Sequence, residues 1–243
     1  MATRRSARTP AVRALVAVLA LVAGGCAGTA TPDSGTTMPE TGPTTTAPPG
    51  SSAGSATARE RSTTVRLTAI GDSLTGSDGD LAGDDFGPGT WLPHVLGAGE
   101  DGSSVEWVGG WAVPGATTAV MRAQAEPRPD ADVLVVLAGT NDIALGVPAE
   151  EIAANIEAIV ATVGAPRVIV ASVPPIEWAP DLAPRHNAAL EALARGHGWE
   201  FADVAAGLRR GDGWVPGMSD DGVHPTEAGY AVLGRALREA LLR

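Results

Sequence analysis

The sequence is poor in the residues on which several kinds of active site depend. Its 243 residues include no lysine and a single cysteine, Cys26. Without lysine the chain offers no Schiff base, no anchor for pyridoxal phosphate and no P-loop lysine for a nucleotide phosphate. A single cysteine excludes intrachain disulfides, cysteine-rich zinc sites and iron–sulfur clusters.

Histidine is also scarce, with four residues in the chain. His94, His186 and His197 lie in predicted helices or loops without the spacing of metal ligands, and we interpret them as surface or buried structural residues. A metal-dependent phosphoesterase, which needs clustered histidine and aspartate ligands, is therefore the weaker alternative.

Positive charge is rare in the larger part of the chain. Residues 1–63 hold six arginines against three acidic residues, a net charge of +3. Residues 64–243 hold eleven arginines against 25 acidic residues, a net charge of −14. A domain of that sign repels phosphate backbones, so the composition argues against nucleic acid as a partner.

The N-terminus has the organisation of an export signal. Four arginines between residues 4 and 13 precede an apolar run of ten residues, 14–23, which is too short to span a bilayer but fits a signal peptide. Small residues then lead to Cys26, and this arrangement resembles a bacterial lipoprotein signal, in which the cysteine carries lipid. We predict a signal peptide over residues 1–25 and lipidation at Cys26. The alternative is an ordinary secreted protein, and Sec and twin-arginine export both stay open.

The segment after the cysteine is too poor in apolar side chains to fold. Of the 36 residues from 27 to 62, 30 are Ala, Gly, Ser, Thr or Pro. Such a segment cannot offset its ordering entropy, and as a flexible coil it would reach about 30–36 Å. We predict a lipidated cysteine and a disordered spacer over residues 26–63. The spacer would hold a single domain, residues 64–243, away from the outer face of the cell membrane.

The last 180 residues alternate predicted strands and helices. The continuous apolar run at 133–138 is typical of a strand that is buried on both faces. The strands are expected at 65–70, 105–108, 133–138, 168–173 and 199–204, and the helices at 150–163, 183–195 and 226–242. Pro225 is expected at the first position of the last helix. This alternation predicts a parallel sheet with helices on both faces.

Polar, glycine-containing motifs follow three of these strands. The first strand leads into Gly-Asp-Ser-Leu at 71–74, the second into residues 110–115, and the third into Gly-Thr-Asn-Asp at 139–142. A fourth motif, Asp-Gly-Val-His at 221–224, precedes the last helix. Ligands of open parallel sheets bind beyond the carboxyl ends of the strands, so three of the motifs should share one edge. A serine in a tight turn, a distant Asp–His pair and an asparagine are the parts of an acyl-transfer site.

These motifs, in this order and at about this spacing, resemble those of the SGNH, or GDSL-type, hydrolases. The resemblance extends over most of residues 65–242. It implies an α/β fold, a three-layer α/β/α sandwich with a five-stranded parallel sheet. It also implies a hydrolase of ester bonds that needs neither cofactor nor metal.

The resemblance assigns a role to five residues. Ser73 matches the nucleophile, His224 matches the base that removes its proton, and Asp221 matches the carboxylate that orients the imidazole. The oxyanion hole is matched by the backbone N–H groups of Ser73 and Gly115 together with the side-chain amide of Asn141.

The leading hypothesis is an exported serine carboxylic-ester hydrolase, an esterase or lipase that acts as a monomer. Its substrate would be an ester of a small molecule, a lipid or an acylated carbohydrate. Carbohydrate deacetylation, lipolysis and thioester cleavage stay open, because acyl and alcohol specificity depends on the shape of the pocket. A non-catalytic glycan-binding lipoprotein on the same fold is the alternative from another class, although a binding module needs no Ser–His–Asp set.

Two further features are expected near the motif-bearing edge. Trp91, Trp111, Trp178 and Trp214 are predicted in loops there, where they either bind sugar rings and acyl chains or anchor the core. Residues 76–90, which are rich in glycine and aspartate, are predicted to form a lid or rim over the acyl pocket.

Overall fold

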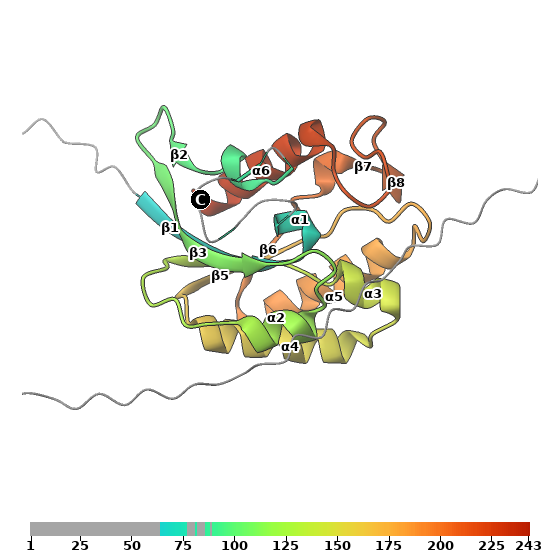
Figure 1. The fold of residues 1–243 in the computed structure, drawn as a ribbon, viewed down its shortest axis with the longest axis horizontal. Coiled ribbons are helices and arrows are strands. Elements are labelled where there is room, and N and C mark those ends of the chain that lie inside the picture. The colour runs from blue at the N-terminus through green and yellow to red at the C-terminus, as the bar shows by residue number, and fades with distance from the viewer. Residues whose placement is uncertain (1–63, 77–80, 82–85, 88) are drawn as a thin grey trace, which may run out of the picture. The chain divides into compact units, whose positions relative to one another are not determined.

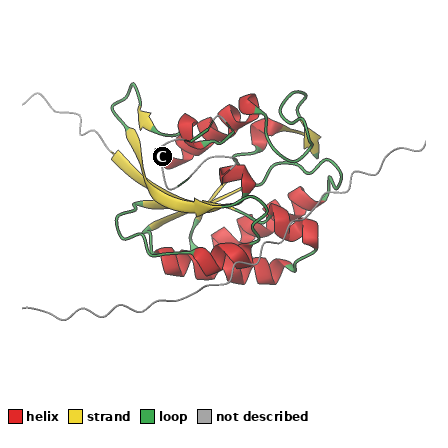
Figure 2. Cartoon of the chain, in the orientation of Figure 1, coloured by secondary structure: helices red, strands yellow, loops and turns green. Residues whose placement is uncertain are grey.

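The computed structural model describes residues 64–76, 81, 86–87 and 89–243. The predicted signal peptide, Cys26, the spacer and most of the predicted lid segment lie outside the described residues. The described residues form an α/β fold in which a twisted sheet is covered by helices on both faces (Figures 1 and 2). None of the described helices is long and apolar enough to cross a membrane.

The central sheet has six strands in the order β2-β3-β1-β4-β5-β6. They are β1 (Thr64–Gly71), β2 (Gly97–Ala98), β3 (Ser104–Ala112), β4 (Val133–Leu137), β5 (Arg167–Ala171) and β6 (Glu200–Ala202). The five predicted parallel strands are confirmed. The expected strand count is too low, because β2 adds an antiparallel edge strand. A separate hairpin consists of β7 (Arg209–Arg210) and β8 (Gly213–Trp214). These extra strands have two residues each, too few for an alternating pattern.

The helices divide into three long ones and several short turns. They are α1 (Ser73–Gly76), α2 (Thr118–Gln124), α3 (Thr140–Leu145), α4 (Ala149–Val163), α5 (Leu182–His197) and α6 (Glu227–Leu241), with 3₁₀ turns η1 (Leu92–His94) and η2 (Ala206–Leu208). The three predicted helices are confirmed as α4, α5 and α6. The expected start of the last helix is wrong, because Thr226 is the N-cap and accepts a hydrogen bond from the Gly229 N–H at 3.3 Å. Pro225 therefore lies just outside the helix.

The two faces of the sheet bury separate hydrophobic clusters. Figure 1 shows α6 over one face and α2, α4 and α5 over the other. Strand β4 contributes to both clusters, since Val133, Val135 and Leu137 pack in the first, whereas Leu134 and Val136 pack in the second. All five side chains are buried, which explains the continuous apolar run in the sequence.

The order of the strands places a switch point between β1 and β4. The chain passes from β1 to β3 on one side and then crosses to β4 on the other side. The loops after β1 and β4 therefore lead in opposite directions, and ligands of open α/β sheets bind at such points. Ser73 follows β1 and Asn141 follows β4, so both lie at this switch point.

Candidate active site

Ser73 opens a single helical turn at the carboxyl end of β1. The turn is tight, because the backbone N–H of Gly76 donates to the carbonyl of Asp72 at 2.8 Å. Gly71 leaves room for this turn beside β4. A Cβ at that position would lie 2.8 Å from the Cβ of Thr75 in the turn and 2.9 Å from the carbonyl oxygen of Leu137 in β4. Asp72 is buried and Ser73 is partly exposed, so the turn presents the serine hydroxyl beyond the edge of the sheet.

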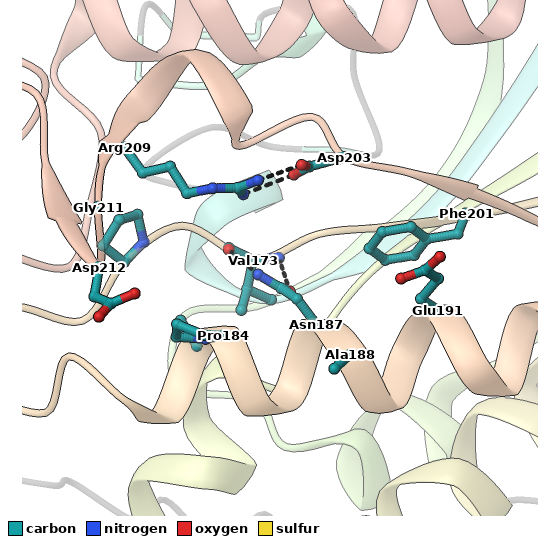
Figure 3. A pocket seen from close by; sticks show the side chains of 12 residues that line it. Val173, Pro184, Asn187, Ala188, Glu191, Phe201, Asp203, Arg209, Gly211 and Asp212 are labelled. Carbon is teal, nitrogen blue, oxygen red and sulfur yellow. Dashed lines mark hydrogen bonds and ion pairs between the residues drawn. The ribbon is translucent and has the colours of Figure 1, made fainter.

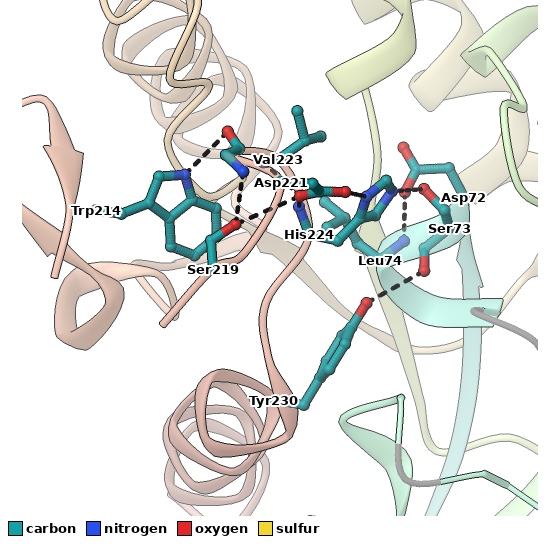
Figure 4. A network of polar contacts seen from close by, with 10 residues as sticks. Asp72, Ser73, Leu74, Trp214, Ser219, Asp221, Val223, His224 and Tyr230 are labelled. Carbon is teal, nitrogen blue, oxygen red and sulfur yellow. Dashed lines mark hydrogen bonds and ion pairs between the residues drawn. The ribbon is translucent and has the colours of Figure 1, made fainter. Parts of the chain in front are cut away.

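The structure brings Ser73, His224 and Asp221 into one row of hydrogen bonds (Figure 4). His224 Nδ1 lies 2.7 Å from Asp221 Oδ2, and His224 Nε2 lies 2.8 Å from Ser73 Oγ. A neutral imidazole whose Nδ1–H donates to the carboxylate has its lone pair on Nε2. The serine hydroxyl can therefore donate its proton directly toward the ring.

The loop that carries Asp221 and His224 is fastened through Gly222. The carbonyl of Gly222 accepts hydrogen bonds from the Glu177 N–H at 2.8 Å and from Trp214 Nε1–H at 3.0 Å, and its N–H donates to Ser219 Oγ at 2.9 Å. Gly222 has φ +78°, and a Cβ there would lie 2.6 Å from the Cβ of Glu177. The motifs in the sequence do not include Glu177 or Trp214, and no local pattern connects either residue with this loop.

Hydrogen bonds determine the ionisation of Asp221. Burial opposes its charged form, but the His224 ring and the backbone N–H groups of Val223 and His224 donate to it and lower its pKa to about 2. Asp221 is therefore ionised wherever the protein is folded near neutral pH. An ionised carboxylate at Nδ1 favours the tautomer described above.

Two backbone N–H groups close to this row are available as donors. Gly71 pairs with Ala112 across β1 and β3, so the loop that carries Gly115 leaves the sheet beside the turn of Ser73. Within the described part of the chain, the N–H groups of Ser73 and Gly115 have no hydrogen-bond acceptor. Gly115 has φ +78°, and a Cβ there would meet nothing within 4 Å, so its backbone conformation and not crowding favours glycine.

The amide of Asn141 connects the loops that follow β1, β3 and β4. Its Nδ2 donates to the carbonyl of Ala116 at 3.0 Å and to Asp72 Oδ2 at 3.3 Å. Ala116 is the residue after Gly115, so the side chain of Asn141 lies next to both predicted backbone donors. All five residues that the sequence assigns to the site are thus brought to one end of the sheet.

Two buried carboxylates hold these loops from below. Asp142 accepts hydrogen bonds from the Thr118 N–H at 2.9 Å and from its hydroxyl at 2.6 Å, which ties α3 to the start of α2. Asp72 accepts a hydrogen bond from the Leu74 N–H at 3.0 Å. Burial raises the pKa of Asp72 to about 7, although the Leu74 N–H and the nearby His224 favour its charged form.

The other histidines lie apart from one another. His186 is buried on α5 with Nε2 3.1 Å from the carbonyl oxygen of Ala138, and burial lowers its pKa. His197 is exposed and lies 2.9 Å from Glu157, and His94 is in η1. Among the residues that the structure describes, no group of three or more His, Cys, Asp or Glu side chains could hold a metal ion.

The prediction that all four tryptophans lie in loops is wrong for two of them, because Trp111 lies in β3 and Trp214 in β8. Trp91 is fully buried and its Nε1–H donates to Thr75 Oγ1 at 3.2 Å. Trp111 packs against the second hydrophobic cluster, which includes the buried side chains of α4. Trp214 donates its hydrogen bond to Gly222 in the loop of His224. Trp178 is 63% exposed, so it is the tryptophan of the four that is free to contact a ligand.

A mostly parallel α/β sheet with a Ser–His–Asp row beyond its carboxyl edge is an arrangement typical of serine hydrolases. The model of the GDSL-like lipase/acylhydrolase family matches residues 69–232, and the chain belongs to this family. Members of the family hydrolyse ester bonds, so the protein is an enzyme of that class. The predicted SGNH (GDSL-type) relationship is thereby confirmed.

Solved structures share the fold. A member of the lipolytic protein G-D-S-L family from Veillonella parvula is 19% identical with a TM-score of 0.57, covering 74% of this chain and 99% of its own. Axe2, an acetylxylan esterase from Geobacillus stearothermophilus, is 19% identical with a TM-score of 0.56, and the match covers 73% of this chain and 94% of Axe2. TesA is 21% identical with a TM-score of 0.55, and the match covers 73% of this chain and 98% of TesA. A search of curated proteins finds no match.

Proposed function

We propose that the protein is an extracytoplasmic serine carboxylic-ester hydrolase with Ser73, His224 and Asp221 as its catalytic triad. The observation that carries the proposal is the row of hydrogen bonds from Ser73 Oγ through the His224 ring to Asp221, at 2.8 and 2.7 Å. A serine hydroxyl is a weak nucleophile until a base removes its proton, and this row supplies the base and its orienting carboxylate.

In the acylation step, Ser73 Oγ attacks the carbonyl carbon of the ester while its proton passes to His224 Nε2. The tetrahedral intermediate then collapses, the bond to the alcohol oxygen breaks, and that oxygen takes the proton from His224. A water molecule attacks the acyl-enzyme in the same way, with His224 again as base, and releases the acid and free Ser73. Asp221 stays ionised throughout and stabilises the imidazolium form of His224.

The negative charge on the carbonyl oxygen requires fixed donors. We assign these to the N–H groups of Ser73 and Gly115 and to the amide of Asn141. Both hydrogens of the Asn141 amide are engaged, and the longer of its two bonds is the one to Asp72, at 3.3 Å. We expect the oxyanion to replace Asp72 as the acceptor of that hydrogen when the intermediate forms.

The experiment that tests this function compares Ser73→Ala with a matched serine variant. Ser103 lies in the turn between β2 and β3, so Ser103→Ala removes one hydroxyl away from the site. With aryl acetates, Ser73→Ala should lose nearly all turnover and Ser103→Ala should keep it. Full activity in a folded Ser73→Ala protein would refute the serine mechanism. Absence of turnover by the wild-type protein on every ester would favour the non-catalytic glycan-binding alternative.

The acyl and alcohol parts of the substrate are best separated by a substrate series. The likeness in fold to an acetylxylan esterase supports the inclusion of acetylated sugars beside aryl esters of increasing chain length and thioesters. A preference for short acyl chains on sugars would indicate a carbohydrate deacetylase. A preference for long chains would indicate a lipase or thioesterase.

We propose that the enzyme is exported and anchored by lipid at Cys26. Three features support this location: the basic segment, the ten apolar residues 14–23, and the chain's one cysteine, which follows them after two glycines. A charge of −14 over residues 64–243 is repelled by anionic headgroups, so attachment would depend on the acyl chains, of which two or more are needed for stable binding. Cys26→Ala should release the protein or leave its signal uncleaved. An unmodified mature peptide that begins at another residue would refute the anchor.

A further inference from the structure

A second cavity lies at the carboxyl ends of β5 and β6, on the same edge of the sheet as the candidate active site. Its volume is about 290 Å³. Figure 3 shows Arg209 and Asp203 along one side of it and Asn187 and Ala188 of α5 along the opposite side. This volume is at the small end of the range for ligand sites and suits a single ring better than a long chain.

The polar walls of this cavity are held in place by contacts within the protein. Arg209 forms a two-bonded ion pair with Asp203, in which Nη1 and Oδ1 are 2.7 Å apart, and the hydroxyl of Ser172 donates to the same oxygen at 2.9 Å. The amide of Asn187 accepts from the Val173 N–H at 2.8 Å and donates to the Val173 carbonyl at 2.9 Å. The cavity therefore needs no ligand to fix its shape.

Several polar groups around the cavity keep hydrogen-bonding capacity to spare. A guanidinium group has five N–H donors, and Arg209 uses two of them on Asp203. Asn187 has a second amide hydrogen that is not in use. The carboxylate of Asp212 has no hydrogen bond or ion pair to any residue in the described part of the chain. Donors and acceptors thus face the same space.

The lining selects the chemistry of a ligand. Glu191 and Asp212 disfavour an anion, whereas the guanidinium of Arg209 and the carboxylate of Asp203 neutralise each other in their ion pair. A wholly apolar chain would take water away from these groups without replacing its hydrogen bonds, which is costly. Phe201 and Ala188 add apolar surface. A neutral ring with hydroxyl groups at its rim and C–H groups on its faces satisfies both parts of the lining, and a pyranose is such a ring.

The cavity is also coupled to the loop of the candidate triad. Val173 lines it, and four residues later the backbone N–H of Glu177 donates to Gly222, which lies between Asp221 and His224. Two to three strand spacings separate β1 from β5 and β6, roughly 10–14 Å. An alcohol built of several linked rings could occupy the cavity while its ester group lies at Ser73.

We propose that this cavity binds a pyranose ring in the alcohol part of the substrate and makes the enzyme a hydrolase of acylated oligosaccharides. The assignment of the ring to a substrate rests on the proposed esterase function. The binding of the ring itself does not.

Binding is tested directly by calorimetry on the full-length protein with three probes: cellotetraose, xylotetraose and the tetramer of N-acetylglucosamine. At least one should bind to wild type and to Ser73→Ala alike. Asp212→Ala removes the unpaired carboxylate and Ala188→Trp fills the cavity from α5, and each should weaken binding at least fivefold. Asp130→Ala is the matched control, because this exposed acid precedes β4 at the opposite end of the strands. The affinity of this variant for the sugar should equal that of wild type. Absence of binding by all three probes, or equal affinity in all variants, would overturn the proposal, as would binding of choline in their place.

Kinetics connect the cavity to the reaction. On an acetylated form of the tetrasaccharide that binds, Asp212→Ala and Ala188→Trp should lower kcat/KM at least fivefold, and on 4-nitrophenyl acetate they should stay within twofold of wild type. Equal losses on both substrates would overturn the role in substrate selection. Sugar binding by a wild-type protein that hydrolyses no ester would instead refute the proposed function and leave the binding site intact.

Discussion

The two ends of the central sheet are built for different purposes. At the end where the strands begin, charged groups have partners: Arg66 pairs with Asp132 at 2.8 Å and Arg167 pairs with Glu200 at 2.6 Å. At the end where the strands finish, the N–H groups of Ser73 and Gly115 have no acceptor among the described residues. At the first end the charged groups are paired within the protein, whereas at the second end backbone donors are left available for a ligand.

The difference extends to charged groups that are partly or fully buried. Arg167 also donates to the last carbonyls of α6, at 2.7 Å to Ala240 and 2.6 Å to Leu241, so its cost of burial is repaid by hydrogen bonds. Asp72, behind Ser73, is fully buried and has its pKa raised to about 7. We infer that the finishing end gives up some stability to hold a reactive arrangement. Substitutions there should affect turnover, and substitutions at the other end should affect the free energy of unfolding.

The largest effect is expected from the histidine of the row. His224→Ala removes the proposed base and should lower kcat by roughly 10⁴–10⁶, and Asp221→Asn should lower it by roughly 10²–10⁴. His197→Ala, at an exposed histidine on α5, is the control and should leave kcat unchanged. Initial rates on an aryl acetate measure all three. Turnover above a tenth of wild type in a folded His224→Ala protein would break the distinction between the two ends.

The next effect concerns the oxyanion donors. Asn141→Ala should lower kcat by about 10²–10³, with a smaller change in KM, because the donor acts on charge that develops in the transition state. Asn141→Asp keeps the size of the side chain but lacks the N–H, so its loss should be at least as large. Stopped assays at several substrate concentrations separate kcat from KM. An unchanged kcat in both variants would remove Asn141 from the oxyanion hole.

The beginning end of the sheet should respond in stability. Arg167→Ala leaves Glu200 and two helix-end carbonyls without their donor and should cost about 1–3 kcal/mol of unfolding free energy. Arg195→Ala breaks an exposed ion pair with Glu191 and should cost less than about 1 kcal/mol. Urea unfolding gives both values, and kcat should stay within twofold of wild type. A large loss of kcat in Arg167→Ala would show that the two ends are not separable.

The last effect is a pH dependence of the stability that comes from Asp72. Because its folded pKa lies near 7 and its usual value near 4, the folded state retains a proton that the unfolded state releases between those pH values. This group therefore lowers stability as pH rises from about 4 to 7. Asp72→Asn should remove that slope from a plot of unfolding free energy against pH. A plot for the variant that runs parallel to wild type would contradict the raised pKa.

Much of this fold follows from the sequence, because its signals are local. The apolar run 133–138 and the regular spacing of Ile152, Ile156 and Ile159 each arise from burial of a single element, and they appear as β4 and as the buried side of α4. The short elements leave no such signal, since the seven residues of α2 and the six of α3 are too few for a clear helical period. The start of α6 is also not visible in the sequence, because it is set by the hydrogen bond between the Gly229 N–H and the Thr226 side chain, which forms only in the folded chain.

The candidate site likewise contains residues that the sequence predicts and residues that it does not. Ser73, Asn141 and the Asp221–His224 pair lie in motifs whose order along the chain could be read directly. The residues that hold them are brought in by tertiary contacts, such as Trp214 Nε1–H on the Gly222 carbonyl. Arg209 and Asp203 are six residues apart in an unremarkable segment, and their pairing in the second cavity depends on the path of the chain after β6.

The central claim is that His224 activates Ser73 as a nucleophile, and covalent labelling tests it most directly. The protein is treated with a fluorophosphonate and the modified peptide is identified by mass spectrometry. We predict one adduct per chain, on Ser73, that forms far more slowly in His224→Ala. An adduct on a different serine with Ser73 unmodified, or labelling of Ser73 at the same rate without His224, would contradict the claim.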